Sequence, residues 1–107
     1  MAREQFQTLT EPMYYILLSL MEECCGVNIM EKVETISAGR VKVGPGTLYA
    51  MLSKFEENHI IVKTAEIGRR KSYVITDLGK EMVEKEYKRL RIMAEDGERY
   101  FRKKDLI

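Results

Sequence analysis

The sequence predicts a mainly α-helical fold with one β-hairpin, in the order helix, helix, helix, strand, strand, helix. Apolar residues recur at a helical period of about 3.6 residues from residue 13 to residue 55, and again after residue 76. Between these stretches, residues 60–67 and 72–76 are short runs rich in β-branched and aromatic residues, which favour strands. A chain of 107 residues with 45% apolar content can bury one modest core, so we expect a single domain.

The first helix is predicted to begin at Glu11-Pro12, because proline is favoured in the first turn of a helix, and Gly26 can end it. Its apolar positions at helical spacing are Met13, Ile16, Leu17, Leu20, Met21 and Cys24. A second, shorter helix is predicted over about residues 27–37, with Gly39 at its end. Its apolar face consists of Ile29, Val33 and Ile36.

The third helix is predicted to start at Gly44-Pro45 and to end at Asn58-His59. Its buried stripe is predicted to consist of Leu48, Leu52 and Phe55. The start of this helix, "GPGTLY", is not a P-loop, because the GK[ST] that closes such a loop is missing. Its small residues would instead let a duplex come close to the first turn, whose unpaired N–H groups can reach phosphates.

Two runs of strand length, "IIVKTAEI" (60–67) and "SYVIT" (72–76), flank the basic turn "GRRK" (68–71). An isolated hairpin is marginally stable in water, so its apolar face should pack on the helices. The helical pattern resumes at Thr76-Asp77. This order is that of the winged helix-turn-helix. We expect residues 1–76 to form a DNA-binding part and residues 77–107 a long C-terminal dimerisation helix, together one compact unit.

The formal net charge is only +1, but the charges are unevenly distributed along the chain. Residues 1–39 hold two basic and six acidic side chains, residues 40–71 hold seven and three, and residues 72–107 hold nine and eight. The excess of basic residues in the middle third can form a surface that meets a polyanion. We therefore expect double-stranded DNA as a partner. The residues expected to contact it are Pro45, Gly46, Thr47, Tyr49, Ala50, Lys54, Arg69, Arg70 and Lys71.

Two segments resemble the PadR family of bacterial transcriptional repressors. "PGTLYAMLSKFEENHII" (45–61) is similar to the family's G-T-L-Y segment with its leucine-rich helix and closing apolar pair, and "GRRKSYVITDLGKE" (68–81) matches its G-R-x-[KR]-x-Y-x-[IL]-T-x-x-G pattern. The resemblance spans roughly residues 12–81. It implies a homodimer on a pseudo-palindromic operator, dimerised by the last helix, and the short C-terminal region resembles the family's smaller subgroup. Cys25-Gly26-Val27 and Gly44 depart from the family's frequent His-Gly-Tyr and Ser.

An apolar seam in the last helix also favours a dimer. Its positions are 4, 3, 4, 3 and 4 residues apart, which is the repeat of about 3.5 residues found in helices that pack along their length. A helix of about 25 residues would run about 38 Å, further than so small a core can cover, so a second protomer is the better cover. The seam consists of Val83, Tyr87, Leu90, Ala94, Gly97 and Phe101.

Two other interpretations stay open. A winged-helix adaptor would bind proteins without reading DNA, although it would not need a basic hairpin tip beside an exposed Lys54. A small-molecule or redox sensor would act near Met21, Cys24 and Cys25, and the seven methionines suit a small apolar effector. The cysteines are more simply explained as small apolar residues that pack at the end of a helix.

No residue spacing in the chain indicates an enzyme, a metal site or a cofactor. One histidine and a single pair of adjacent cysteines offer too few of the usual ligands for zinc. The longest nearly apolar run, residues 13–21, is too short to span a bilayer, and "MAREQFQ" does not resemble a secretory signal. We therefore expect a cytoplasmic protein with no membrane partner.

Overall fold

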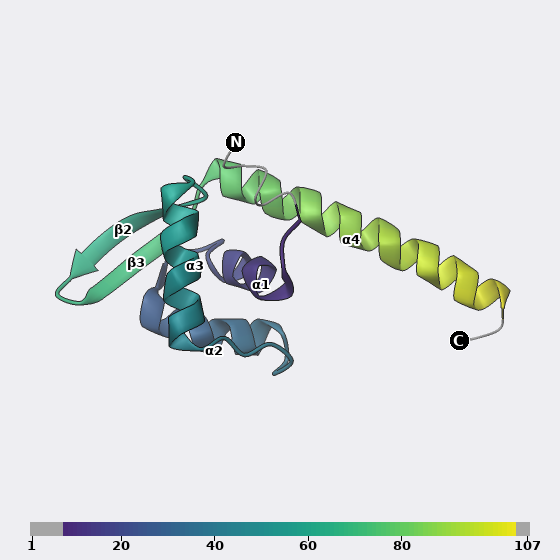
Figure 1. Ribbon diagram of the computed structural model, residues 1–107, viewed down its shortest axis with the longest axis horizontal. Helices are drawn as coiled ribbons and strands as arrows, with labels where there is room; N and C mark the ends of the chain where they lie inside the picture. Colours follow the sequence, from purple (N-terminus) through teal and green to yellow (C-terminus); the bar gives the residue numbers. More distant parts are fainter. Residues whose placement is uncertain (1–7, 105–107) are drawn as a thin grey trace.

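Within residues 8–104, which the computed structural model describes, the chain forms four helices and a three-stranded antiparallel sheet (Figure 1). In chain order these are α1 (Glu11–Ser19), β1 (Cys24–Cys25), α2 (Gly26–Ile36), α3 (Pro45–Glu57), β2 (Ile61–Ile67), β3 (Arg70–Ile75) and α4 (Asp77–Lys103). The predicted order is confirmed, with β1 as an addition. Figure 1 shows α1, α2, α3 and the hairpin gathered into a body from which most of α4 projects.

The first helix is shorter than predicted. It begins at Glu11 as expected, but it ends at Ser19 instead of continuing to Gly26. Met21, which the predicted apolar face included, is 46% exposed. The helical spacing of residues 20–24 was therefore misleading, and Cys24 is not a helical residue.

Strand β3 is the reason for this early end. The Ile75 N–H donates a hydrogen bond of 2.9 Å to the carbonyl of Leu20, directly after the helix. The chain then runs beside β3 as β1, whose residue pairs are Cys24 with Tyr73 and Cys25 with Ser72. Pairing with β1 satisfies backbone groups of β3 that would otherwise form an open sheet edge. We infer that these hydrogen bonds stabilise the chain more than a further turn of α1 would.

The core lies between the helices and the inner face of the hairpin. Five of the six residues predicted for the apolar faces of the second and third helices are exposed by 2% or less, namely Ile29, Val33, Leu48, Leu52 and Phe55. The prediction was wrong for Ile36, which is 41% exposed. Ile36 is the last residue of α2, and the chain turns away after it through Ala38 and Gly39, both at positive φ.

The end of α3 agrees with the prediction and depends on a left-handed residue. His59 has φ of 60°, a value that is uncommon outside glycine. The Ile60 N–H donates to the Phe55 carbonyl at 2.9 Å, and the His59 N–H donates to the Glu56 carbonyl at 3.1 Å. These two bonds are those of a Schellman motif, which ends the helix and directs the chain into β2.

The hairpin, or wing, is formed by β2 and β3 in antiparallel register from Ile61–Ile75 to Ile67–Arg70, with a bulge between Lys63 and Ala65. Its turn is tighter than the predicted residues 68–71. Gly68 adopts φ of 62°, which permits a turn of two residues, so Arg70 and Lys71 already belong to β3.

The start of α4 is fixed by a network around Thr76. The Thr76 N–H donates to the Ile60 carbonyl at 2.9 Å, and the Thr76 hydroxyl can donate to the carbonyl of His59 (2.7 Å) or of Ile60 (2.9 Å). The same hydroxyl accepts a hydrogen bond from the Gly79 N–H at 3.1 Å, which caps the helix. A Cβ atom on Gly79 would overlap the Ile60 carbonyl oxygen and lie 2.5 Å from Cγ1 of Ile75. Only glycine lets α4 come this close to the body.

Only the first part of α4 covers the body, through the buried residues Gly79, Val83 and Glu86. The Glu86 carboxylate accepts hydrogen bonds from the Leu9 N–H (2.8 Å) and from Nε of Arg89 (2.6 Å). The Arg89 guanidinium is the main reason that the pKa of Glu86 is lowered, despite its burial. This carboxylate therefore ties the segment before α1 to α4.

We predict that Gly79→Ala lowers the free energy of unfolding by about 3 kcal/mol, because the added methyl group meets a backbone carbonyl that cannot move aside. Urea denaturation would measure this. Gly46→Ala is the matched control, since a Cβ at Gly46 has no neighbour within 4 Å. The control should be as stable as the wild type or gain up to about 1 kcal/mol from helix propensity. Equal stability of the two variants would contradict the packing described here.

Candidate nucleic-acid interface

The two faces of α3 differ sharply. The face with Leu48, Leu52 and Phe55 is buried in the core. The predicted DNA-contacting residues of this helix are all exposed: Pro45, Gly46, Thr47, Tyr49, Ala50 and Lys54. The helix starts as predicted, with Gly44 as N-cap and Pro45 as the first residue, and its first turn holds no acidic side chain. It therefore presents small side chains and free backbone N–H groups at an accessible end.

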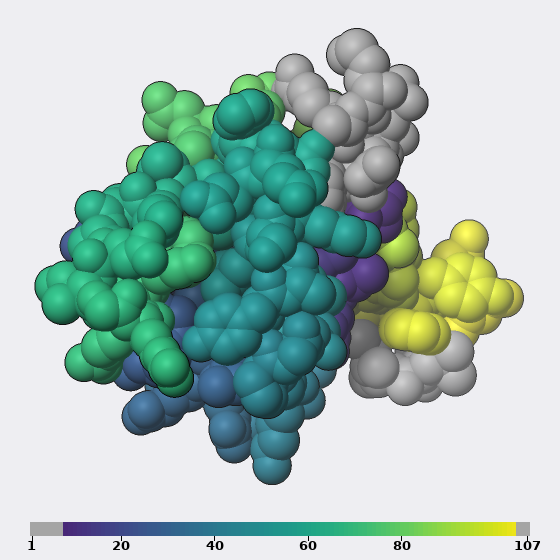
Figure 2. Space-filling model, turned by 60° about the vertical axis from the view of Figure 1, so that its left-hand side comes forward, coloured from purple at the N-terminus to yellow at the C-terminus, as the bar shows by residue number. Residues whose placement is uncertain are grey.

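The wing lies on the same side of the molecule as this exposed face. Figure 2 turns that side forward and shows α3 and the hairpin next to each other, forming one continuous face. Arg69 lies in the turn of the wing, and Arg70 and Lys71 follow it on β3. Together with Tyr49 they line a single cavity of about 280 Å³. The structure thus brings four of the nine predicted residues to one place, while the other five line the open side of α3.

The basic residues of the middle third fall into two groups. Three of the seven have acidic partners: Arg40 lies 3.6 Å from Glu11, Lys42 lies 3.9 Å from Glu34, and Lys63 lies 2.6 Å from Glu66. Within residues 8–104 the other four form no ion pair with a carboxylate, namely Lys54, Arg69, Arg70 and Lys71. These four are the cations that the sequence analysis assigned to DNA.

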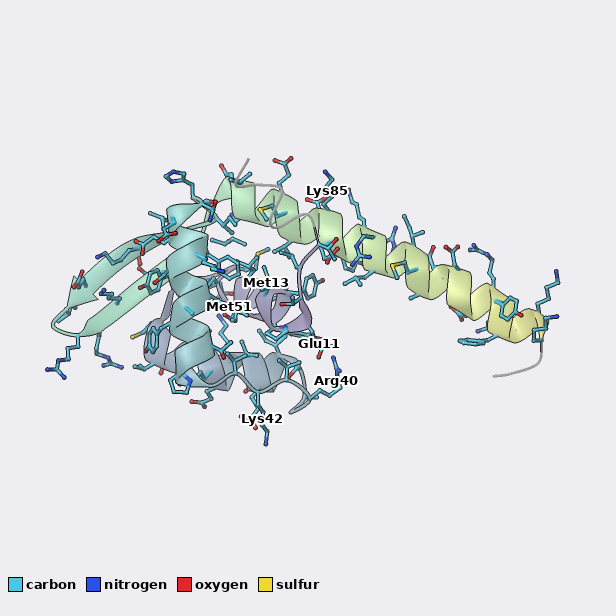
Figure 3. All side chains as sticks on the ribbon, viewed as in Figure 1. Glu11, Met13, Arg40, Lys42, Met51 and Lys85 are labelled. Carbon is cyan, nitrogen blue, oxygen red and sulfur yellow. The ribbon has the colours of Figure 1, made fainter. Side chains whose placement is uncertain are left out.

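Arg40 is one of the basic residues whose charge is paired within the protein. Figure 3 shows Arg40 and Glu11 pointing toward each other, while Lys42 points away from the body. Nη2 of Arg40 also donates a hydrogen bond of 3.0 Å to the Tyr15 hydroxyl. The residue therefore connects the loop before α3 to α1, and much of its charge is already balanced.

Tyr49 packs beside Gly26, which is not among the predicted site residues. A Cβ atom on Gly26 would lie 3.3 Å from Cε1 of Tyr49 and 3.7 Å from the Lys71 carbonyl oxygen. Gly26 thus allows the first turn of α2 to pack closely against α3 and the wing. Val27 and Ser53 also line the cavity and were also missed. Ser53 lies one helical turn after Tyr49, so its spacing was a usable signal, whereas only the folded chain places α2 here.

The cysteine pair does not resemble a reactive centre. Cys24 and Cys25 are both half-buried free thiols on β1, where successive side chains point to opposite faces of the sheet. Burial is the main cause of a raised pKa of Cys24, which lowers the fraction present as the nucleophilic thiolate. Among the described residues, no three His, Cys, Asp or Glu side chains are grouped so that they could hold a metal ion. No helix in residues 8–104 has both the length and the apolar character of a membrane span.

Comparison with solved structures shows the same fold in proteins of low sequence identity. A transcriptional regulator from Clostridium thermocellum superposes with a TM-score of 0.68 at 17% identity, covering 92% of this chain and 91% of that one. A PadR family transcription regulator from Clostridium difficile gives a TM-score of 0.64 at 21% identity, covering 82% and 97%. A complex structure of hsRosR gives 0.61 at 22% identity, covering 92% and 97%.

Sequence comparison gives one further relative and the family. An uncharacterized 37.1 kDa protein in a transposon of Streptomyces fradiae is 33% identical over 61 residues, and this chain spans only 17% of its length. The model of the transcriptional regulator PadR-like family matches residues 16–85, which include α3, the wing and the start of α4. The chain belongs to the PadR-like family of transcriptional regulators.

Proposed function

We propose that the protein is a DNA-binding transcriptional repressor that acts as a homodimer on a pseudo-palindromic operator. The observation that carries this proposal is the division of charge described above. Of the seven basic residues in the middle third of the chain, the four that lack an acidic partner all lie on α3 and the wing, on one side of the body. A surface of unpaired cations beside a helix with a small, open first turn is suited to a polyanionic duplex.

In this proposal α3 enters the major groove with its N-terminal end. Pro45 and Gly46 let the duplex come close, and the side chains of Thr47 and Ala50 face base edges. Lys54, Tyr49 and the wing residues Arg69, Arg70 and Lys71 contact phosphates, which fix the position of the protein without reading sequence. Occupation of an operator by such a complex would repress transcription by blocking access to the DNA.

The dimer would form along α4. Val83 is buried in its own chain, so the seam available to a partner begins at Tyr87. Tyr87, Leu90 and Phe101 are between 40% and 49% exposed. They continue the face that Gly79, Val83 and Glu86 bury against the body, because Val83 and Leu90 are one heptad apart. A second copy of α4 would cover this apolar surface, and it would place the two α3 helices at a fixed separation.

Replacing Arg69 and Arg70 with Ala should weaken binding to all duplexes alike and reduce its salt dependence. Four cations in each protomer neutralise eight phosphates per dimer, which gives a slope of log K against log[salt] of roughly −7, and the variant should flatten it by roughly 3 to 4 units. Fluorescence anisotropy would measure this with DNA from the gene's own upstream region and with a scrambled duplex. Replacing Lys85 and Lys88 of α4 with Ala removes the same charge elsewhere and should keep the wild-type slope. Retention of that slope by the wing variant would instead favour the adaptor interpretation.

Gly46→Ala should separate DNA binding from folding. The added methyl group meets no protein atom, so the fold is kept, but it occupies space that the duplex needs. We expect a loss of roughly ten- to a hundredfold in operator affinity, the equivalent of a modest steric overlap. Anisotropy titration measures the affinity, and urea denaturation controls for stability. Unchanged affinity would show that α3 does not approach DNA with this end.

Leu90→Asp should dissociate the dimer without unfolding the protomer, since Leu90 is 40% exposed in the single chain. An unpaired charge buried in the interface costs about 3 kcal/mol, which raises the dimer Kd at least roughly a hundredfold. Ile92→Asp is the matched control, because Ile92 is 55% exposed and lies on the opposite side of α4. Sedimentation analysis at micromolar concentration measures both. A wild-type monomer, or equal effects of the two variants, would contradict this dimer.

A further inference from the structure

The cavity between α2, α3 and the wing has features beyond those of an open DNA-contacting surface. Its volume of about 280 Å³ is close to the lower end of small-ligand pockets, which begin at about 300 Å³. Val27 at the start of α2 forms one side, and Tyr49 and Ser53 from α3 form another. Arg70 and Lys71 come from the wing. Three elements that are distant in sequence therefore converge on one concave site.

The charge of the lining is entirely positive. Arg69, Arg70 and Lys71 contribute three cations, and none of the described residues that line the cavity carries a carboxylate. The acidic residue opposite Lys71 in the sheet is Glu66, and it accepts a hydrogen bond of 2.6 Å from Nζ of Lys63. That hydrogen bond is the main cause of the lowered pKa of Glu66. Lys63 thus balances the carboxylate of the residue that pairs with Lys71 across the sheet.

The polar groups of the lining are hydrogen-bond donors as well. The hydroxyl groups of Tyr49 and Ser53 can each donate to an anionic oxygen. A Cβ atom on Gly26 would lie 3.5 Å from the Tyr49 hydroxyl oxygen, so this donor lies directly beside the first turn of α2. Hydroxyl donors combined with guanidinium and ammonium groups are the chemistry that recognises a phosphate group.

We propose that this cavity is a phosphate-binding site in which Val27 and Ser53 belong to the lining. The phosphate can come from either of two sources, the backbone of operator DNA or a free small ligand. A free ligand in the cavity would compete with DNA. The first source rests on the proposed function, and the second does not. In either case the first turn of α2 becomes part of the binding surface, beside α3 and the wing.

The first arm of the test uses free phosphate. The full-length protein is titrated with inorganic pyrophosphate at low salt and followed by ¹⁵N NMR. We expect saturable shifts at the amides of Gly26, Val27 and Lys71. Val27→Glu, which places a negative charge in the lining, should weaken this binding at least tenfold. Val62→Glu is the matched control, because Val62 is 47% exposed against 48% for Val27 but does not line the cavity. Chemical shifts that change at all basic residues without reaching saturation would overturn the proposal.

The second arm uses the upstream duplex and anisotropy titration. A backbone phosphate in the cavity predicts that Val27→Glu lowers DNA affinity at least tenfold and Ser53→Ala severalfold, while Val62→Glu has little effect. If pyrophosphate binds saturably but Val27→Glu and Ser53→Ala leave DNA affinity unchanged, the site is supported and its ligand is a free phosphate compound. If the wild type binds no DNA, the proposed function fails, but the first arm still decides the cavity. Equal behaviour of Val27→Glu and Val62→Glu in both arms would overturn the proposal.

Discussion

The close contact between the first turn of α4 and the backbone of residue 60 is the constraint on which the rest of the structure depends. The Ile60 carbonyl accepts a hydrogen bond from the Thr76 N–H, and the Thr76 hydroxyl donates to the carbonyl of His59 or Ile60. Gly79 packs against Ile60 without a side chain. Ile60 directly follows the cap of α3, and Thr76 directly follows β3. One junction therefore fixes the direction of the exposed helix, the wing and α4 together. In a dimer built on α4, the same junction would set the distance between the two α3 helices.

The distribution of ion pairs complements this geometry. Arginines of α4 such as Arg89, Arg99 and Arg102 all have acidic partners on the same helix. Exposed pairs of this kind contribute little to stability, but they leave α4 without a strong field of either sign. The four unpaired cations of α3 and the wing differ from these arginines, and within residues 8–104 no carboxylate lines the cavity that three of them share. A small net charge is therefore compatible with one strongly basic face, which is what nonspecific attraction to DNA requires.

The sequence predicted the elements that have a local period, and it missed what only tertiary contacts create. The stripe Leu48, Leu52, Phe55 and the long last helix were readable from spacing alone. The two-residue strand β1 has no period of its own and exists because β3 offers it a partner, so the cysteines were placed on a helix instead. The role of Gly26 was hidden for the same reason. Thr76 and Gly79 belong to a family pattern in the sequence, but the reason for the glycine, its packing on Ile60, depends on the tertiary structure.

The central claim is that α3 and the wing form the surface that meets DNA, while the distal part of α4 meets a second copy of the chain. Hydrogen–deuterium exchange of the protein with and without the upstream duplex tests it most directly, because it reports the contact surface without any substitution. We predict that DNA slows exchange in the first turn of α3, in residues 68–71 and at the start of α2, and leaves the distal half of α4 unchanged. Protection confined to α4, or no protection at α3 under conditions where the duplex binds, would contradict the account.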